Sequence, residues 1–313
     1  MSSDTPTRHA IVATAREAIA RGSKSFGLAS RLFDRRTRER AWLLYAWCRA
    51  CDDVTDGQAF GGSLGAGRDP AAIRTLTDRA LAGQWVGEAS FDGLRLLCAE
   101  VPIPRTMIED HLAGFDLDAA GWRPQTEADL IRYCHHVAGA VGQMMAVVMG
   151  VRADDDETLG YADDLGIAFQ LANIARDVRE DAAGGRVYLP VEWLDEDERL
   201  RQFREKSRNA DRGPNGFSTS LDADGEVQAM VLLTRRLADL AQTYEARARI
   251  GARRLPFRSR WAVLAAAGIY GDIAREVARR GAAALETRVV TSRAAKLGWV
   301  MRALWQAREG ARR

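Results

Sequence analysis

The stretch AWLLYAWCRACDDVTD, residues 41–56, indicates a helix whose apolar beginning runs into three aspartates. Because a helix turns by about 100° per residue, its polar side chains share one stripe. This stripe contains Tyr45, Arg49, Asp52, Asp53 and Asp56. The opposite sides are apolar and contain Trp42, Leu43, Trp47 and Val54. Burying a carboxylate costs several kcal/mol unless a positive partner compensates its charge. A core helix that presents acids therefore predicts a cation on its polar side.

A second stretch, FQLANIARDVREDAAGGRVYLP at residues 169–190, repeats this arrangement. On the helix predicted over 155–181, one side carries oxygen-bearing side chains and a glycine that leaves space beside them. These residues are Gly166, Gln170, Asn173, Asp177 and Asp181. The neighbouring side is apolar and consists of Ile167, Leu171, Ile174 and Val178. The chain between the two stretches is long enough for several helices, so we expect the two acidic sides to face each other.

Most charge clusters are solvated helix faces, but two observations argue against that interpretation here. Like charges four residues apart destabilise a helix by a few tenths of a kcal/mol unless something compensates them. Both helices are also too apolar elsewhere to lie loosely on a surface. Facing carboxylates suit Mg²⁺, which takes oxygen ligands at about 2.0–2.1 Å and fills its remaining positions with water and substrate phosphate. The pattern therefore predicts Mg²⁺ with a phosphate-bearing ligand beside an apolar cavity that holds a hydrocarbon. The basic residues expected to contact the phosphate are Lys24, Arg49 and Arg176.

Other metal centres fit the sequence less well. A di-iron site in a helical bundle needs Glu-x-x-His pairs, and no histidine follows a glutamate at that spacing. The four histidines are His9, His111, His135 and His136. A zinc site would need a second ligand pair to complete the Cys-x-x-Cys spacing. We therefore expect the four thiols to pack between helices, as free cysteines commonly do. They are Cys48, Cys51, Cys98 and Cys134.

Composition limits the class of protein. Hydrophobic residues make up 47% of the chain and charged residues 28%, which excludes disordered and fibrous proteins. The formal net charge of +2 provides no overall field for a polyanion, so no nucleic-acid partner is expected. The longest apolar stretches fall short of the roughly 18 residues that a membrane-spanning helix needs, and the N-terminus has no apolar signal core. A cytoplasmic protein is therefore expected.

The hydrophobic pattern is helical nearly throughout, and prolines lie between the periodic segments. Since no linker separates two cores, we expect one all-α domain over residues 1–313. Helices are predicted near 8–22, 35–56, 70–83, 88–100, 104–120, 126–149, 155–181, 190–206, 226–251, 257–281 and 289–309. The polar segment 207–225 is expected to be a mobile loop, and the acids of 153–157 are expected to begin a helix. The glycines of 60–70 follow no strand, so no dinucleotide-binding loop is expected.

Several motifs occur together in the order of a known family. They are GSKSFGLASRLFDRRTR, LLYAWCRACDDVTD, YCHHVAGAVGQMM, GIAFQLANIARDVREDAAGGRVYLP and YGDIAREV. Over roughly residues 15–295 the chain resembles the squalene/phytoene synthase family, and within it the bacterial phytoene synthases. The resemblance implies an all-α isoprenoid synthase bundle with a central cavity. It also implies the Mg²⁺-dependent head-to-head condensation of two geranylgeranyl diphosphates into phytoene, through a cyclopropyl diphosphate. This reaction is the first committed step of carotenoid biosynthesis.

The same resemblance implies roles for individual residues. The implied metal ligands are Asp52 and Asp56 for one cluster and Asn173, Asp177 and Asp181 for the other. The four aspartates among them, together with Arg49, are the implied catalytic residues. The implied contacts to diphosphate and prenyl atoms are Ser23, Lys24, Ser25, Tyr45, Arg49, Gln170, Arg176, Tyr188 and Tyr270. The expected cofactor is Mg²⁺, with Mn²⁺ as a substitute to be tested, and no NADPH is expected.

Two residues depart from the family pattern, and several alternatives stay open. His135 stands where a tyrosine is expected, and Thr55 stands where an aliphatic residue is usual. One alternative is a dehydrosqualene or squalene-type synthase that uses farnesyl diphosphate. Others are a terpene cyclase, a chain-elongating prenyltransferase and a non-catalytic helical scaffold. The sequence indicates neither the prenyl chain length nor the oligomeric state.

The C-terminal segment 289–313 is expected to form a basic helix. From Arg288 onward the chain has seven basic residues and one acidic residue. An apolar side is formed by Trp299, Val300, Leu304 and Trp305. This pattern is compatible with peripheral contact to the inner membrane surface and equally with a helix that packs on the domain.

Overall fold

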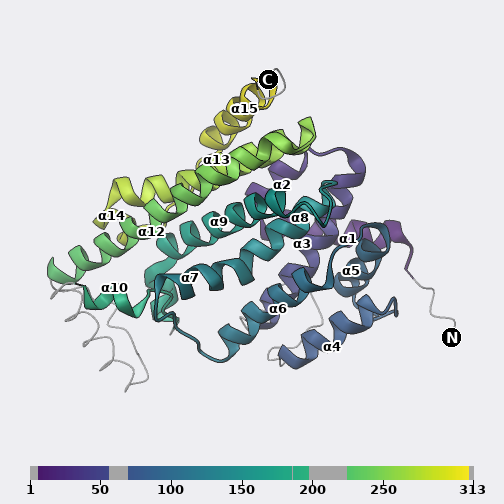
Figure 1. Ribbon diagram of the computed structural model, residues 1–313, viewed down its shortest axis with the longest axis horizontal. Helices are drawn as coiled ribbons and strands as arrows, with labels where there is room; N and C mark the ends of the chain where they lie inside the picture. The colour runs from purple at the N-terminus through teal and green to yellow at the C-terminus, as the bar shows by residue number, and fades with distance from the viewer. Residues whose placement is uncertain (1–5, 56–69, 185, 197–223, 310–313) are drawn as a thin grey trace.

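The computed structural model describes residues 6–55, 70–184, 186–196 and 224–309 (Figure 1). Every regular element in these ranges is helical, so the predicted all-α class is confirmed. The first half contains α1 (Arg8–Gly22), α2 (Lys24–Ser30), α3 (Arg35–Thr55), α4 (Pro70–Leu81), α5 (Ala89–Glu100), α6 (Arg105–Ala119), α7 (Glu127–Cys134), the π-helix η1 (His135–Gly139) and α8 (Ala140–Val148). The second half contains α9 (Asp156–Ala183), α10 (Val191–Asp195), α12 (Asp224–Gly251), the 3₁₀-helix η2 (Ala252–Arg254), α13 (Phe257–Arg280), α14 (Ala282–Glu286) and α15 (Arg293–Glu309).

The helices differ from the predicted ones in a few places. The single helix predicted over 126–149 contains a π-turn, η1, between α7 and α8, because an inserted residue does not interrupt the apolar pattern. The short α2 was not predicted, since its seven residues are too few for a clear period. Near 190–206 a helix is described only as α10, and residues 197–206 lie outside the described ranges. The predicted loop 207–225 also lies outside them, except for its last two residues, which begin α12.

Local sequence explains where the long helix α9 begins. The side chain of Asp155 accepts a hydrogen bond from the backbone N–H of Thr158 at 3.1 Å, and Asp156 and Glu157 occupy the first turn. Acids at these positions satisfy unpaired N–H groups and interact favourably with the helix dipole. The prediction that the acids of 153–157 begin a helix is therefore confirmed.

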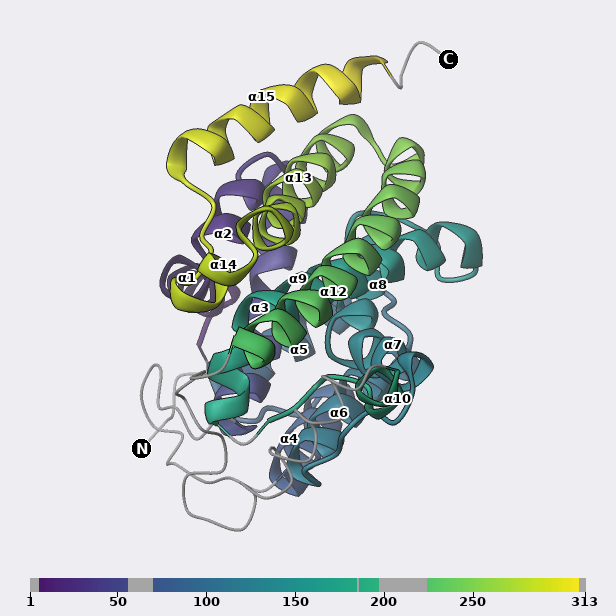
Figure 2. The ribbon, with the colours of Figure 1, turned by 90° about the vertical axis from the view of Figure 1, so that its left-hand side faces the viewer.

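Helix α9 lies in the middle of the molecule and packs against α8, η1, α12 and α13 (Figures 1 and 2). One group of buried side chains includes Trp47 of α3, while another includes Leu171 of α9. Cys48 and Cys51 belong to the first group and Cys134 to the second, and none of the four cysteines forms a disulfide. The predicted packing role of these three buried thiols is confirmed.

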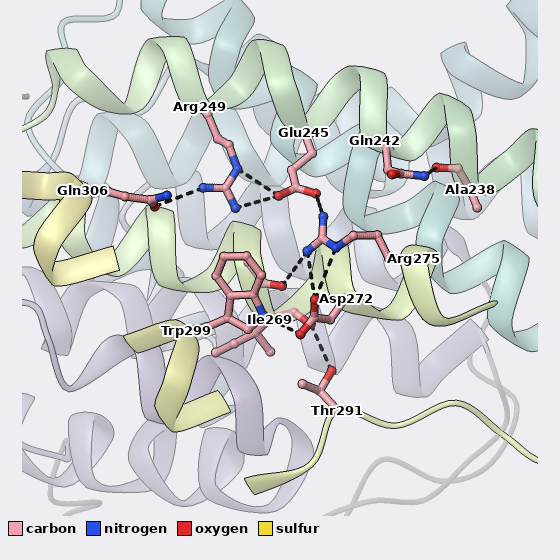
Figure 3. Close-up of polar contacts among 11 residues, drawn as sticks. Ala238, Gln242, Glu245, Arg249, Ile269, Asp272, Arg275, Thr291, Trp299 and Gln306 are labelled. Atoms are coloured by element: carbon pink, nitrogen blue, oxygen red, sulfur yellow. Dashed lines mark hydrogen bonds and ion pairs between the residues drawn. The ribbon is translucent and has the colours of Figure 1, made fainter. Parts of the chain in front are cut away.

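Helix α15 lies along the outside of the bundle, next to α13 (Figures 1 and 2). Figure 3 shows how it is attached: the indole of Trp299 packs on α13 and donates a hydrogen bond to Asp272. Arg275 forms ion pairs with two acids. Its Nη2 lies 3.1 Å from Asp272 Oδ1, and its Nη1 lies 2.8 Å from Oε2 of the buried Glu245. Glu245 in turn accepts a hydrogen bond from Arg249 at 2.7 Å. A network of charges and hydrogen bonds therefore attaches α15, through Trp299, to α12 and α13.

In the part of the chain that the structure describes, no helix combines the length and the apolar character needed to cross a bilayer.

Candidate functional site

An apolar cavity of about 320 Å³ lies between α3, α8, α9 and α13, so the predicted cavity is present. Most of its wall is aliphatic or aromatic, including Phe26, Met145 and Leu165. The rings of Phe169 and Tyr270 stack at 4.3 Å between centroids and form another part of the wall. Such a wall excludes water and suits a hydrocarbon ligand.

Six polar side chains that line this cavity belong to the predicted site. They are Ser23, Tyr45, Asp52, Gln170, Asn173 and Tyr270, and the wall also contains His111, Thr158 and Tyr161. Asp52 comes from the last turns of α3, while Gln170 and Asn173 come from α9. The structure therefore brings the acidic end of α3 and the oxygen-bearing side of α9 to one cavity. Carboxylate and amide oxygens are donors that hard divalent cations prefer, so these residues fit such an ion.

Residues near the end of α3 and the start of α2 are only partly described. Asp56 lies outside the described residues, and the side chains of Lys24 and Thr55 are not described. Arg49 lies on α3 one turn before Asp52 and is half-buried. Ser25 is half-buried on α2 but does not line the cavity.

Two cavity residues at the start of α2 also have structural partners. The hydroxyl of Ser23 caps α2 by accepting a hydrogen bond from the N–H of Phe26 at 3.2 Å. The ring of Tyr45 packs against Phe26 at 5.7 Å between centroids. Its hydroxyl lies so close to Gly22 that a Cβ there would overlap it. Glycine at this position therefore allows Tyr45 to reach the cavity.

Asp177 does not line the cavity, because its carboxylate pairs with two arginines. Arg176 Nε lies 2.7 Å from its Oδ1, and Arg288 Nη2 lies 3.0 Å from its Oδ2. Arg176 itself is largely buried, and Arg288 follows α14 in the chain. Arg288 was missed by sequence reasoning, since nothing in its local sequence indicates this partner. A metal ion or phosphate that bound Asp177 or these arginines would have to replace the ion pairs.

Asp181 lies one turn further along α9, in a small second pocket with Arg186 and Tyr188. Burial, reinforced by the charge of Asp177, raises the pKa of Asp181 to about 7. A nearby cation would stabilise the ionised form of a carboxyl group in this environment and so lower its pKa. Asp181 is therefore compatible with a metal ligand, although it does not line the main cavity.

Tyr188 is buried away from the main cavity. Its hydroxyl donates to Asp118 Oδ1 at 3.1 Å, and its ring stacks on Tyr133 at 4.9 Å between centroids. Tyr133 donates to the same carboxylate at 2.9 Å. Burial and the neighbouring Asp118 charge raise the pKa of Tyr188. The structure thus gives this tyrosine a packing and hydrogen-bonding environment near Asp181.

Gly166 lines the cavity, but its missing side chain also accommodates another helix. A Cβ at Gly166 would overlap the backbone carbonyl of Ala138 in η1. Likewise, a Cβ at Gly142 of α8 would overlap the carbonyl of Ala162 in α9. The expected space at Gly166 is therefore occupied in part by backbone, and these glycines let α8, η1 and α9 approach closely.

Comparisons with known proteins agree with this geometry. A family model described as squalene/phytoene synthase matches residues 19–295. A 15-cis-phytoene synthase from Enterobacter agglomerans is 40% identical over 291 residues, which cover 91% of this chain and 92% of that protein. A phytoene synthase from Pseudescherichia vulneris is 39% identical over 295 residues, which cover 92% of this chain and 89% of that protein.

Solved structures share the arrangement of helices. A dehydrosqualene synthase superposes with a TM-score of 0.78 at 24% identity, over 96% of this chain and 98% of that chain. A squalene synthase from Alicyclobacillus acidocaldarius superposes with a TM-score of 0.69 at 24% identity, over 88% of this chain and 95% of that chain. These similarities support the fold, and the sequence matches settle the relationship. The chain belongs to the squalene/phytoene synthase family.

Proposed function

We propose that the chain condenses two molecules of geranylgeranyl diphosphate head to head into phytoene, through a cyclopropyl diphosphate. Similarity to bacterial phytoene synthases over about nine-tenths of the chain confirms the predicted phytoene synthase function and prenyltransferase class. The observation that carries the choice of substrate class is the meeting of Asp52 and Asn173 at an apolar cavity. Oxygen donors beside an apolar wall match a ligand with a diphosphate head and a hydrocarbon tail.

We propose Mg²⁺ as the divalent ion, with Mn²⁺ as a substitute to be tested. The residues that would hold it are Asp52, Asp56, Asn173, Asp177 and Asp181. When bound, a divalent ion neutralises charge on the leaving diphosphate. The hard oxygen donors of Asp52 and Asn173 fit this ion.

The side chains of the protein contribute binding, charge and exclusion of water. Arg176 and Arg288 would donate hydrogen bonds to diphosphate oxygens in exchange for the carboxylate of Asp177, because guanidinium groups bind both anions in the same way. Arg49 lies on the helix that also presents Asp52 and supplies further positive charge. The stacked rings of Phe169 and Tyr270 offer aromatic faces to a cationic intermediate. The aliphatic wall keeps water from the same cation.

One incubation tests this proposal. Protein, Mg²⁺ and either geranylgeranyl or farnesyl diphosphate are combined with and without NADPH, and the hydrocarbon is identified by mass spectrometry. Phytoene formed from geranylgeranyl diphosphate without NADPH is the expected product. Preferential conversion of farnesyl diphosphate would contradict the proposed substrate, and a cyclic product would contradict the proposed reaction type. Substitution of Mn²⁺ for Mg²⁺ in the same assay tests the choice of metal.

We also propose that α15 contacts a membrane surface. Leu297, Met301 and Trp305 recur at every fourth position and are 61%, 59% and 62% exposed. Of the apolar side predicted from sequence, Trp299 and Val300 instead contact α13. Arg293, Arg302 and Arg308 are exposed on the same helix, and basic residues beside an apolar face favour anionic lipid.

Vesicle sedimentation tests the membrane contact. Replacing Leu297, Met301 and Trp305 together by serine should release the protein from anionic vesicles, while leaving Trp299 and its network intact. Leu232→Ser removes an apolar side chain that is 48% exposed on α12 and serves as the matched control. Unchanged sedimentation of the triple variant would contradict the contact.

A further inference from the structure

Outside the cavity, one group of side chains combines two imidazoles and a carboxylate. Asp110 comes from α6, and His135 and His136 are the first two residues of the π-helix η1. One possible ligand atom from each lies within 4.8 Å of the other two. None of the three lines the cavity, although their neighbours His111, Val137 and Ala138 do. The cluster therefore lies behind the cavity wall, separate from the cavity residues Asp52 of α3 and Asn173 of α9.

The distances within the cluster are close to those of a metal site. His135 Nε2 lies 3.7 Å from Asp110 Oδ2, and His136 Nδ1 lies 3.9 Å from Asp110 Oδ1. Ligands that bind a tetrahedral Zn²⁺ at about 2.0–2.1 Å are separated by about 3.4 Å. The two histidine–carboxylate distances exceed that spacing by a few tenths of an ångström.

A second carboxylate orients one of the imidazoles. Asp163 of α9 lies 2.6 Å from His135 Nδ1, on the side of the ring opposite Asp110. This hydrogen bond places a proton on Nδ1 and directs Nε2 toward Asp110. A carboxylate that holds a histidine in this way is the usual outer partner of a metal-binding imidazole. Gly139 makes the contact possible, because a Cβ there would overlap the carboxylate of Asp163.

The other imidazole has a buried nitrogen that lacks a hydrogen bond. His136 Nδ1 is inaccessible to solvent and makes no hydrogen bond, while its nearest carboxylate is Asp110 at 3.9 Å. Leaving a buried polar atom without a partner costs roughly 1–3 kcal/mol. A metal ion between His136 and Asp110 would satisfy this atom.

The local backbone also has an unusual form. Residues 135–139 form a π-turn between two α-helices, and such turns occur frequently at functional sites. The two consecutive histidines that begin this turn both approach Asp110.

We propose that Asp110, His135 and His136 form a second metal site, which binds a divalent transition ion of the zinc class. Two imidazoles and one carboxylate are ligands that suit Zn²⁺ and Co²⁺ better than Mg²⁺. Three protein ligands leave one position for water, and Asp110 is accessible, with 42% of its side chain exposed. The ion would join α6 to η1, and through Asp163 to α9, behind the wall that His111 and Val137 form.

Metal titration of the tag-free, full-length chain tests this site. After treatment with a chelator, Co²⁺ is added in the presence of excess Mg²⁺, and the visible absorption of tetrahedral Co²⁺ is followed. Bound Zn²⁺ is counted by equilibrium dialysis. We expect one ion per chain that Mg²⁺ does not displace. Asp110→Asn and His136→Gln should each lose this ion, and Asp163→Asn should weaken its binding by about 10–100-fold.

Two matched controls locate the ion. His9→Gln removes an exposed histidine of α1 that is outside the cluster, and Asp52→Asn removes a cavity carboxylate. Both should bind Co²⁺ as the unaltered chain does. Loss of the ion in Asp52→Asn would overturn the proposal, because it would assign the ion to the cavity. Retention in an Asp110→Asn, His136→Gln double variant that keeps its helicity by circular dichroism would also overturn it.

Discussion

The two halves of α9 carry similar numbers of acids but give them different partners. In the first half, Asp155 caps the helix, Asp163 contacts His135 at 2.6 Å, and Asp164 lies 3.1 Å from Arg247. In the second half, Asn173 lines the cavity, and Asp177 pairs with arginines. The helix itself is continuous across both halves (Figure 1).

We expect the partner of each acid, and not the acid itself, to decide whether it supports the fold or binds a ligand. Partners of the first half are a backbone N–H, an imidazole and an arginine from a neighbouring helix. The arginines around Asp177 can instead exchange one anion for another, because carboxylate and phosphate are bound alike by guanidinium. We therefore expect substitutions in the second half to affect turnover and substitutions in the first half to affect stability.

The largest expected effect is on turnover in Asp177→Asn. The amide is neutral, so it can neither bind a divalent ion strongly nor balance Arg176 and Arg288. Turnover of geranylgeranyl diphosphate should fall by about 100-fold or more, while circular dichroism shows unchanged helicity. The rate of hydrocarbon formation at saturating substrate is the measurement.

Glu180→Gln is the matched control for this variant. Glu180 is an exposed acid three residues further along α9 and lies 3.5 Å from Arg288. Its replacement should change turnover less than a few-fold, since weak exposed ion pairs contribute little. Equal losses of turnover in both variants would show that the total negative charge of the second half of α9 supports the reaction, and that Asp177 has no specific role as a metal ligand.

The next effect is expected at the junction of the two halves. Gly166→Ala would place a Cβ against the backbone carbonyl of Ala138, which cannot move aside as a side chain can. Overpacking of this kind costs about 1–3 kcal/mol of folding free energy. Urea unfolding followed by circular dichroism is the measurement.

Gly160→Ala is the matched control in the same helix, and it is expected to stabilise the chain where Gly166→Ala destabilises it. Beyond its chain neighbours and its own helix backbone, a Cβ at Gly160 has no heavy atom within 4 Å, so alanine should raise the free energy of unfolding by about 0.5–1 kcal/mol. If both variants changed stability equally, the close approach of α9 and η1 at Gly166 would be refuted.

Periodicity predicted the acidic sides of α3 and α9, because their polar residues recur at helical spacing within apolar segments. It could not show that Asn173 reaches the cavity while Asp177 is held by Arg288, because that ion pair joins residues far apart in sequence. Periodicity also could not predict the π-turn at residues 135–139. One extra residue in a helix leaves a helical apolar pattern both before and after it, so the sequence still indicates one continuous helix.

The role of His135 also could not be predicted, although its departure from the family pattern was visible. Its partners are Asp110 of α6 and Asp163 of α9, and neither is near it in sequence. For the same reason sequence did not separate Tyr188 from the main cavity. Its environment depends on Asp118, which lies 70 residues earlier in the sequence. Folding brings the Asp118 carboxylate to 3.1 Å from the Tyr188 hydroxyl.

A pH dependence is expected in the first half of α9. Burial raises the pKa of Asp164 to about 6, and Arg247 only partly opposes this effect. The folded chain therefore binds this proton more tightly than the unfolded chain, where the pKa of an aspartate is about 3.9. The contribution of Asp164 to stability is then present below about pH 4 and is lost as the pH rises to about 6.

Asp164→Asn removes this titration. Above pH 6 the variant should be more stable than the original chain by about 1–2 kcal/mol, and the difference should shrink toward pH 4. Urea midpoints of both chains from pH 4 to pH 7.5 measure it. A difference that did not depend on pH would show that Asp164 is already ionised throughout this range.

The smallest expected effect is at the first turn of α9. Asp155→Ala removes the acceptor for the N–H of Thr158 and should lower the melting temperature by roughly 1–4 °C. Asp154→Ala is its control, because Asp154 is exposed and pairs only with the neighbouring Arg152, so the melting temperature should hardly change. Turnover should be unaffected in both variants, since neither residue lines the cavity. A loss of turnover in Asp155→Ala without a loss of stability would remove the distinction between the two halves of α9.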